Sequence, residues 1–368
     1  MKATMMHTPM TVQLIMQHGA DVFPDSQVGV FDGNTVSHTP YSRIAANATR
    51  LAAGLAQLGI GVGDRVGTFS WNNTAHMEAY LAIPSMGAIM HTVNIRLSAE
   101  QVAYVINHAE DRVIILDASL QALFEPVIPL LQTVEHVILV GEPPAPLPGD
   151  IASSSYEQLL AGSASHYDWP QLDETSAAAV CYTSGTTGNP KGVVYSHRTT
   201  FVHSMASRAA DTFGISEHDR ILLLPPMFHA NSWGLPYSGW FSGSEFIMPG
   251  PHLQPEGIKA MVRAESPTIT AMVPTILGDL LRASDEEGLD MSSFRMLVCG
   301  GSAVAPAMID AAREKWGVPV LQGWGMTETS PLCALSHPPR EPGPGGETPW
   351  RAKSGRPVAG VQVRVVDD

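Results

Sequence analysis

The sequence predicts an α/β protein in which mainly parallel sheets are covered by helices. Short runs rich in β-branched residues alternate with segments of helical periodicity along most of the 368 residues. Such alternation is typical of parallel sheets, whose strands are buried on both faces and are connected by helices. A chain of this length can bury a sizeable core, which predicts two or three subdomains.

The clearest helix is expected to begin at Thr39 and Pro40. Thr39 suits the N-cap and Pro40 the first helical position. Apolar residues then recur at spacings of three and four and form one stripe: Ile44, Ala48, Leu51, Leu55 and Leu58. Gly59 is a natural end for this helix.

The later elements continue the same alternation. Ser98 and Gln101 resemble a capping box that begins a helix toward His108. Strands are expected at 65–70, 112–117, 136–141, 177–182, 192–195, 220–224, 268–273, 295–300, 318–322 and 361–366. Residues 141–150 and 168–176 are predicted connectors, and residues 337–349, rich in proline and glycine, are a predicted loop.

Composition excludes several classes of protein. Lys and Arg number 21 against 35 Asp and Glu, and the formal net charge is −14. Nonspecific nucleic-acid binding needs clustered positive charge, so no nucleic-acid partner is expected. Cys181, Cys299 and Cys333 show no metal-ligand spacing and are expected to be buried, reduced thiols.

No targeting or membrane-spanning segment is predicted. No stretch reaches 18 uninterrupted apolar residues, and the N-terminus lacks the apolar region of a signal peptide. We therefore expect a cytoplasmic protein with no transmembrane segment. Association with a membrane surface through an apolar substrate, and a homodimeric state, are left open.

The most informative segment reads Tyr-Thr-Ser-Gly-Thr-Thr-Gly-Asn-Pro-Lys-Gly at residues 182–192. Its glycines let the backbone approach a ligand closely, and exposed N–H groups in such a loop form an anion-binding concavity. The hydroxyls add donors, and Lys191 adds a positive charge that suits phosphate. Pro190 follows Gly185 by five residues, so the segment differs from a Walker loop. Because apolar runs flank it on both sides, we predict a polyphosphate clamp between two buried strands.

Residues 183–192 resemble the phosphate-loop signature of the adenylate-forming superfamily, which includes acyl-CoA synthetases, peptide-synthetase adenylation domains and luciferases. Two further motifs stand in family order: residues 226–233, Pro-Met-Phe-His-Ala-Asn-Ser-Trp, and residues 322–329, Gln-Gly-Trp-Gly-Met-Thr-Glu-Thr. The resemblance extends from about Tyr41 to Asp368.

The resemblance implies two related αβ subdomains and part of a small β-barrel within an AMP-binding N-terminal domain that spans residues 1–368. The boundaries expected are 1–175 for the first subdomain, 176–335 for the second, which would carry the phosphate loop, and 336–368 for the start of the barrel. The family's C-terminal domain, with its catalytic lysine, would be absent. We accordingly expect a truncated and weakly active enzyme.

The implied reaction uses ATP, Mg²⁺ and coenzyme A. A carboxylate attacks the α-phosphate of ATP, pyrophosphate leaves, and a thiol then attacks the acyl-adenylate. Both partners of the first step are anionic, so the site must neutralise charge and align the nucleophile. The phosphate contacts are assigned to Thr183, Ser184, Gly185, Thr186, Thr187, Gly188 and Lys191. Glu328 and Thr183 resemble the Mg²⁺ ligands, since Mg²⁺ prefers oxygen ligands and keeps several waters.

The remaining assignments also follow from the resemblance. The AMP pocket is expected to include Gly301, Gln322, Gly323, Trp324 and Thr327. Trp324 replaces the commoner tyrosine, and either ring can stack on adenine. Gly301 would be the position of close backbone approach, although a plain strand-to-helix turn explains the glycines almost as well.

Residues 228–237 look most like those of fatty acyl-CoA synthetases. Lys191, His229 and Glu328 form the expected catalytic set, in which His229 positions charge and does not act as a strong base. Trp233 would gate an acyl tunnel, and a core tryptophan is the plain alternative. The leading hypothesis is therefore a ligase for a medium- or long-chain fatty acid. A ligase for an aryl or short-chain acid, or a nucleotide- and acyl-binding fragment with little activity, remain as alternatives.

Overall fold

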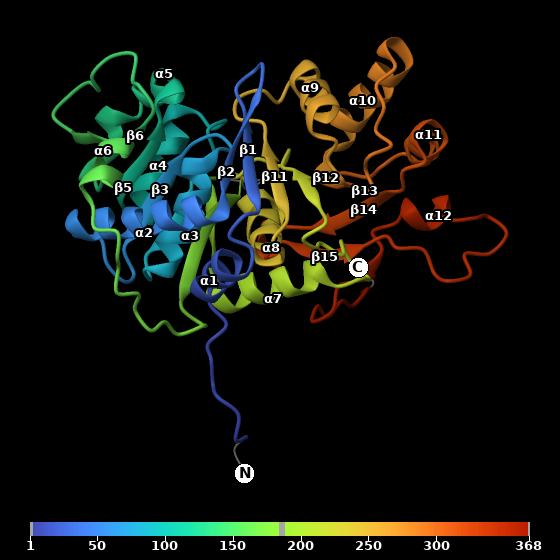
Figure 1. Ribbon diagram of the computed structural model, residues 1–368, viewed down its shortest axis with the longest axis horizontal. Coiled ribbons are helices and arrows are strands. Elements are labelled where there is room, and N and C mark those ends of the chain that lie inside the picture. Colours follow the sequence, from blue (N-terminus) through green and yellow to red (C-terminus); the bar gives the residue numbers. More distant parts are fainter. Residues whose placement is uncertain (1–2, 184–187, 367–368) are drawn as a thin grey trace. The chain divides into compact units, whose positions relative to one another are not determined.

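The computed structural model describes residues 3–183 and 188–366, and the chain divides into two compact units (Figure 1). The first unit comprises Met1–His18, Ala45–Phe69 and Glu78–Val202. The second unit comprises Gly19–Ile44, Ser70–Met77 and His203–Asp368. Each unit is thus discontinuous in sequence, whereas we expected continuous segments divided at residues 175 and 335.

The sheet of the first unit has the order β7-β6-β5-β3-β4-β8-β9 among the described residues. All neighbouring pairs in it are parallel except β8 with β9. Because β8 pairs with β4, the strands that flank the phosphate loop belong to this unit and not to the expected second subdomain. The elements are β3 (Arg65–Phe69), β4 (Ile89–Thr92), α4 (Ala99–Ala109), β5 (Asp111–Asp117), α5 (Gln121–Phe124), β6 (His136–Val140), β7 (Ala152–Ser155), α6 (Tyr156–Gly162), β8 (Ala177–Thr183) and β9 (Lys191–Ser196).

The sheet of the second unit has the order β16-β15-β14-β13-β12-β10-β11-β1-β2. Its centre, from β14 to β1, is parallel, and antiparallel strands extend both edges. The strands are β1 (Gln27–Phe31), β2 (Val36–Pro40), β10 (Arg220–Leu222), β11 (Glu245–Met248), β12 (Ile269–Met272), β13 (Met296–Cys299), β14 (Val320–Gly325), β15 (Leu332–Leu335) and β16 (Arg356–Pro357). The helices are α8 (Leu235–Ser242), α9 (Pro255–Glu265), α10 (Pro274–Glu287), α11 (Pro306–Trp316) and α12 (Thr348–Arg351).

Both helix predictions are confirmed, except that the first helix begins at Tyr41 and not at Pro40. Of the helices with residues in both units, α2 (Tyr41–Gln57) carries the predicted apolar stripe, and Ile44, Ala48, Leu51 and Leu55 are buried. It begins at Tyr41 because Thr39 and Pro40 pair with β1 in the edge strand β2, where a proline costs no ladder bond. At α4 the Ser98–Gln101 capping box is present. The other helices shared by both units are α1 (Val12–Val22), α3 (Thr74–Ser85) and α7 (His197–Arg208).

The strand expected at 361–366 was wrong. These residues form no regular element, and Val365 is 93% exposed. Alternating valines favour a strand only where a neighbouring strand and a core face are available. The predicted state of the cysteines is confirmed, since Cys181, Cys299 and Cys333 are buried and free.

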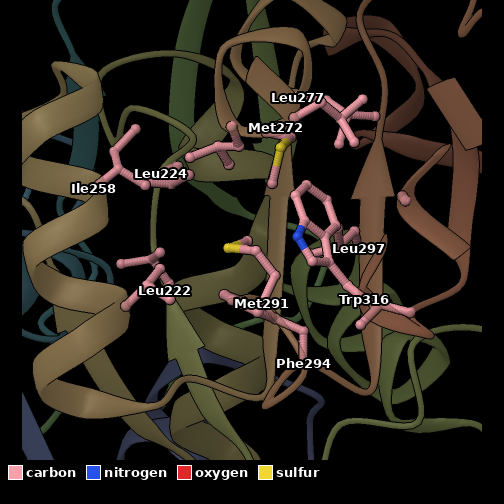
Figure 2. Close-up of a cluster of buried hydrophobic side chains, with 14 of the residues drawn as sticks. Leu222, Leu224, Ile258, Met272, Leu277, Met291, Phe294, Leu297 and Trp316 are labelled. Carbon is pink, nitrogen blue, oxygen red and sulfur yellow. The ribbon is translucent and has the colours of Figure 1, made fainter. Parts of the chain in front are cut away.

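One hydrophobic core cluster of the second unit lies between its sheet and helices α9 to α11 (Figure 2). Leu222 on β10 and Leu297 on β13 pack with apolar side chains of these helices, such as Ile258 and Leu277. Trp316 closes the cluster, and its Nε1 donates to Ser284 Oγ at 3.0 Å. This packing fixes the parallel strands whose carboxyl ends carry the motifs described next.

Candidate functional site

Two of the three sequence motifs lie at the carboxyl ends of parallel strands in the second unit. The chain leaves β10 toward His229 and Trp233, and it leaves β13 into the loop at 300–303. Gly323 and Trp324 lie near the end of β14, two strands from β12. In open α/β sheets this edge is where ligands bind. His229, Gly301, Trp324 and Glu328 are all exposed, as an edge that receives a ligand requires.

The structure brings Trp233 against the glycines of this edge. A methyl group built on Gly300 would lie 3.5 Å from Cη2 and Cζ3 of Trp233 and 2.9 Å from the carbonyl oxygen of Gly323. The indole therefore contacts the loop after β13, beside β14. Trp233 is half-buried, which fits a ring at the edge of a site better than one in the centre of a core.

The segment that carries Trp233 has a left-handed backbone. Ala230, Asn231, Ser232 and Trp233 have φ values of 44°, 49°, 52° and 57°, and Gly234 follows at 75°. A left-handed conformation costs most L-residues roughly 1–2 kcal/mol each, or about 3–6 kcal/mol over Ala230, Ser232 and Trp233, since asparagine adopts it more readily. Surrounding contacts must offset that cost, and strained backbone of this kind is concentrated at functional sites.

Gly301 needs its lack of a side chain. Its φ is 81°, and a methyl group there would lie 3.3 Å from Cγ1 of Val273. The side chain of Gln322 stabilises the same loop, because its Oε1 accepts a hydrogen bond from the Val304 N–H at 2.8 Å. Since Gln322 is buried, it supports the loop that carries Gly301.

The segment after β14 is a tight turn. A methyl group on Gly325 would lie 2.1 Å from the Pro331 carbonyl oxygen, so only glycine fits there. The Met326 N–H donates to Thr329 Oγ1 at 2.9 Å and closes the 3₁₀ turn Thr327–Thr329. Within it Thr327 is buried and Glu328 is exposed, while Trp324 is 40% exposed.

The phosphate loop belongs to the first unit. Thr183 ends β8 and is paired with Lys191, which begins β9, so the two strands hold the base of the loop. Gly188 and Lys191 are exposed. Ser184, Gly185, Thr186 and Thr187 lie outside the described residues.

Tyr182 anchors the end of β8 just before this loop. Its hydroxyl lies 2.7 Å from Nδ1 of His108. Burial, assisted by the charge of Asp111, raises the pKa of Tyr182 to about 12. The hydroxyl therefore stays neutral and remains available for the hydrogen bond near pH 7.

The expected residues thus fall into two sets. His229, Trp233, Gly301, Gln322, Gly323, Trp324, Thr327 and Glu328 belong to the second unit, and Thr183, Gly188 and Lys191 belong to the first. Within the described parts of the chain, no group of three or more His, Cys, Asp or Glu side chains could hold a metal ion. The chemistry of the donors fits Mg²⁺, because an exposed carboxylate such as Glu328 can serve together with phosphate oxygens and waters.

Two residues of this edge escaped the sequence analysis. Val273, directly after β12, is exposed and faces Gly301. Asn72 is buried and hydrogen-bonded to the segment before His229. Pro274, which follows Val273, suits the first position of a helix, but no sequence pattern links Asn72 to a segment some 150 residues away.

These features describe an α/β protein with exposed motif residues at the ligand-binding edge of a parallel sheet. The family profile described as AMP-binding enzyme matches residues 16–368, and the chain belongs to that family. It is 39% identical to the long-chain-fatty-acid–CoA ligase of Thermus thermophilus and 38% identical to the 3-methylmercaptopropionyl-CoA ligase of Ruegeria pomeroyi. Both matches cover 100% of this chain, and respectively 67% and 69% of the relative.

A solved structure supports the fold. The crystal structure of the anthranilate CoA ligase AuaEII in complex with anthranoyl-AMP matches with a TM-score of 0.87 and 24% identity, over 100% of this chain and 68% of that one. The expected α/β fold class, with two mainly parallel sheets and helices, is therefore confirmed, whereas the expected part of a small β-barrel stays a prediction. No helix in the described ranges is long and apolar enough to cross a bilayer.

Proposed function

We propose that this acyl-CoA ligase activates a medium- or long-chain fatty acid with ATP and Mg²⁺ and transfers the acyl group to coenzyme A. One observation carries the proposal: in the segment that resembles fatty acyl-CoA synthetases, Trp233 lies against Gly300, next to the expected AMP position Gly301. The name of the Thermus thermophilus relative supports the same class of acid.

In the first half-reaction, a carboxylate oxygen of the acid attacks the α-phosphorus of ATP. The bond from the α-phosphorus to the bridging oxygen breaks, and pyrophosphate leaves. Lys191 and the loop from Thr183 to Gly188 bind the β- and γ-phosphates and neutralise their charge. Glu328 would serve as a Mg²⁺ ligand, and Mg²⁺ would supply further positive charge to the phosphate oxygens.

The second unit would contribute the contacts to AMP. Gly301 allows close backbone approach to the nucleotide, with Gln322, Gly323 and Thr327 around it, and Trp324 offers its exposed indole to the adenine. His229 orients the reacting carboxylate. Trp233 limits access of the acyl chain to the reacting atoms. In the second half-reaction the thiol sulfur of coenzyme A attacks the acyl carbon, and AMP leaves.

A short-chain acid is the second candidate. It is supported by the 38% identity to a ligase named for 3-methylmercaptopropionate, whose chain is short and contains a thioether. An aryl acid would require a flat pocket, for which no sequence feature argues.

Acid-dependent exchange of labelled pyrophosphate into ATP separates these candidates. The proposal predicts exchange that rises from acetate through hexanoate to decanoate, and that exceeds the rates with 3-methylmercaptopropionate and benzoate. The comparison uses relative rates, so it does not depend on the absolute activity. Fastest exchange with acetate, 3-methylmercaptopropionate or benzoate would reject the fatty-acid assignment.

A further inference from the structure

Asn72 is a buried residue with an unusually complete set of hydrogen bonds to one distant segment. It is 2% exposed. Its Nδ2 donates to the carbonyl oxygens of Leu223 at 2.8 Å and Pro225 at 3.0 Å, and its Oδ1 accepts from the Met227 N–H at 2.7 Å. Two acceptors on one side and a donor on the other fix the orientation of the amide.

The segment at 223–227 needs such a partner. It contains two consecutive prolines, Pro225 and Pro226, which lack N–H groups and cannot continue the β-ladder that ends with β10. The carbonyl groups of Leu223 and Pro225 therefore require donors from elsewhere. Asn72 supplies donors to both, and Ser232 Oγ donates to the Pro225 oxygen as well, at 2.6 Å.

Asn72 is itself held in place. The Gly250 N–H donates to the backbone carbonyl oxygen of Asn72 at 3.1 Å. The two residues form an antiparallel bridge, and Gly250 follows the end of β11 by two residues. The amide is therefore fixed relative to the sheet of the second unit, and the proline segment is fixed through it.

The held segment leads directly into the left-handed turn. The His229 N–H donates to the Pro226 oxygen at 3.0 Å, and the Ser232 N–H donates to the His229 oxygen at 3.0 Å. Trp233 follows and contacts the Gly300 position. Hydrogen bonds thus run from Asn72 through 225–227 to the residues expected at the acyl site. A strained turn persists only where its surroundings hold it, and these bonds are part of that support.

We infer that Asn72, assisted by Ser232, is a positioning residue for the acyl half of the reaction: it holds the proline segment so that His229 and Trp233 meet the acyl-adenylate in the productive geometry. The inference rests on the proposed function. Neither side chain needs to touch the substrate for this role. Its signature is a loss of binding energy from the acyl chain, with binding of the nucleotide retained.

The test measures how much an acyl chain adds to the binding of a nucleotide. Dissociation constants are determined by calorimetry for AMP and for decanoyl-sulfamoyl-adenosine, a stable mimic of decanoyl-AMP, and their ratio is the acyl increment. Asn72→Leu keeps the approximate volume and removes all three hydrogen bonds. It is expected to reduce the acyl increment roughly 10- to 100-fold, the scale of a small misplacement of binding groups. AMP affinity should change less than threefold.

Ser232→Ala provides the second variant and has a matched control. Ser232 and Ser244 are both fully buried, and each donates to one backbone oxygen, at 2.6 Å to Pro225 and at 2.7 Å to Ser216. Ser244 directly precedes β11 and so lies at the amino-terminal end of the strand, whereas the candidate site lies at the carboxyl ends. Both variants should lose similar stability, whereas only Ser232→Ala should reduce the acyl increment.

The outcomes are distinguishable. An unchanged acyl increment in folded Asn72→Leu and in Ser232→Ala would overturn the inference. If Asn72→Leu does not fold, Ser232→Ala against Ser244→Ala decides, and equal acyl increments in these two would overturn it. Wild-type protein that binds decanoyl-sulfamoyl-adenosine no tighter than AMP would refute the proposed acyl site, and the positioning role with it.

Discussion

Replacing Gly301 by alanine tests whether the loop after β13 approaches the nucleotide. The backbone at Gly301 has a φ of 81°, and an added methyl group would lie 3.3 Å from Cγ1 of Val273. The left-handed conformation costs an alanine roughly 1–2 kcal/mol, which lowers the free energy of unfolding by the same amount. For a unit of this size, a loss of 1 kcal/mol lowers Tm by about 2–4 °C.

The chain offers a control with the same backbone cost. Gly317, directly after α11, has a φ of 72°, and a methyl group there meets nothing within 4 Å. Gly317→Ala should therefore lose similar stability and bind AMP as the wild type does. Gly301→Ala should in addition bind AMP at least tenfold more weakly, because 1.4 kcal/mol of lost contact corresponds to a tenfold change in Kd.

The assay is a calorimetric titration of the wild type and both variants with AMP, together with thermal melting of the free proteins. Equal AMP affinity in Gly301→Ala and Gly317→Ala, with comparable melting shifts, would show that Gly301 serves only the strand-to-helix turn. The close-approach role would then be refuted, while the backbone argument would stand.

Three further predictions concern single residues. Asp219 lies at the amino-terminal ends of the strands, and it accepts from Arg295 Nε at 2.6 Å and from Thr268 Oγ1 at 2.8 Å. Because Arg295 is 38% exposed and can be solvated, Asp219→Asn should lower the free energy of unfolding by about 1–3 kcal/mol at pH 7. Burial alone would raise the pKa of Asp219, but bonds from Arg295 and the Ser216 backbone lower it below 3.8. Its stabilisation is therefore present above pH 3.8 and is lost as the pH falls through the depressed pKa, so the wild-type advantage in urea titrations should shrink only below pH 4. Glu328→Ala should reduce the gain in ATP affinity that Mg²⁺ provides, and it should reduce AMP affinity less. Titrations that show an equal loss of both would contradict the metal role. Trp233→Ala should change the preferred chain length in the exchange assay with little effect on ATP affinity. An unfolded variant would instead favour a core role, because truncating a core tryptophan lowers the free energy of unfolding by about 3–5 kcal/mol.

Sequence patterns predicted the elements whose signals are local. The capping box at Ser98 and the apolar stripe of α2 depend on neighbours within a few turns, and both are present. The unit boundaries did not follow from local signals, because β8 joins the first sheet through a partner, β4, that lies far earlier in the chain. The valines at 361–366 show the converse, since alternation without a paired neighbour forms no strand.

The candidate site likewise contains residues that the sequence could indicate and residues that it could not. Glycines and charged residues of the motifs could be proposed as site residues from the sequence, because backbone freedom and phosphate charge require particular residue types. The left-handed turn at Ala230–Gly234 could not, since Ala230, Ser232 and Trp233 give no sign of a positive φ. Asn72 was missed for a related reason, because its three partners lie in a distant segment.

The most direct test of the central claim, that the protein forms an acyl-adenylate, is the identity of the products. The protein, at a concentration comparable to that of its substrates, is incubated with ATP, Mg²⁺ and decanoate without coenzyme A, and the mixture is analysed by mass spectrometry. Formation of an acyl-adenylate predicts decanoyl-AMP and pyrophosphate in equal amounts, and neither without the acid. ADP and phosphate in their place, or no cleavage of ATP after prolonged incubation, would contradict it.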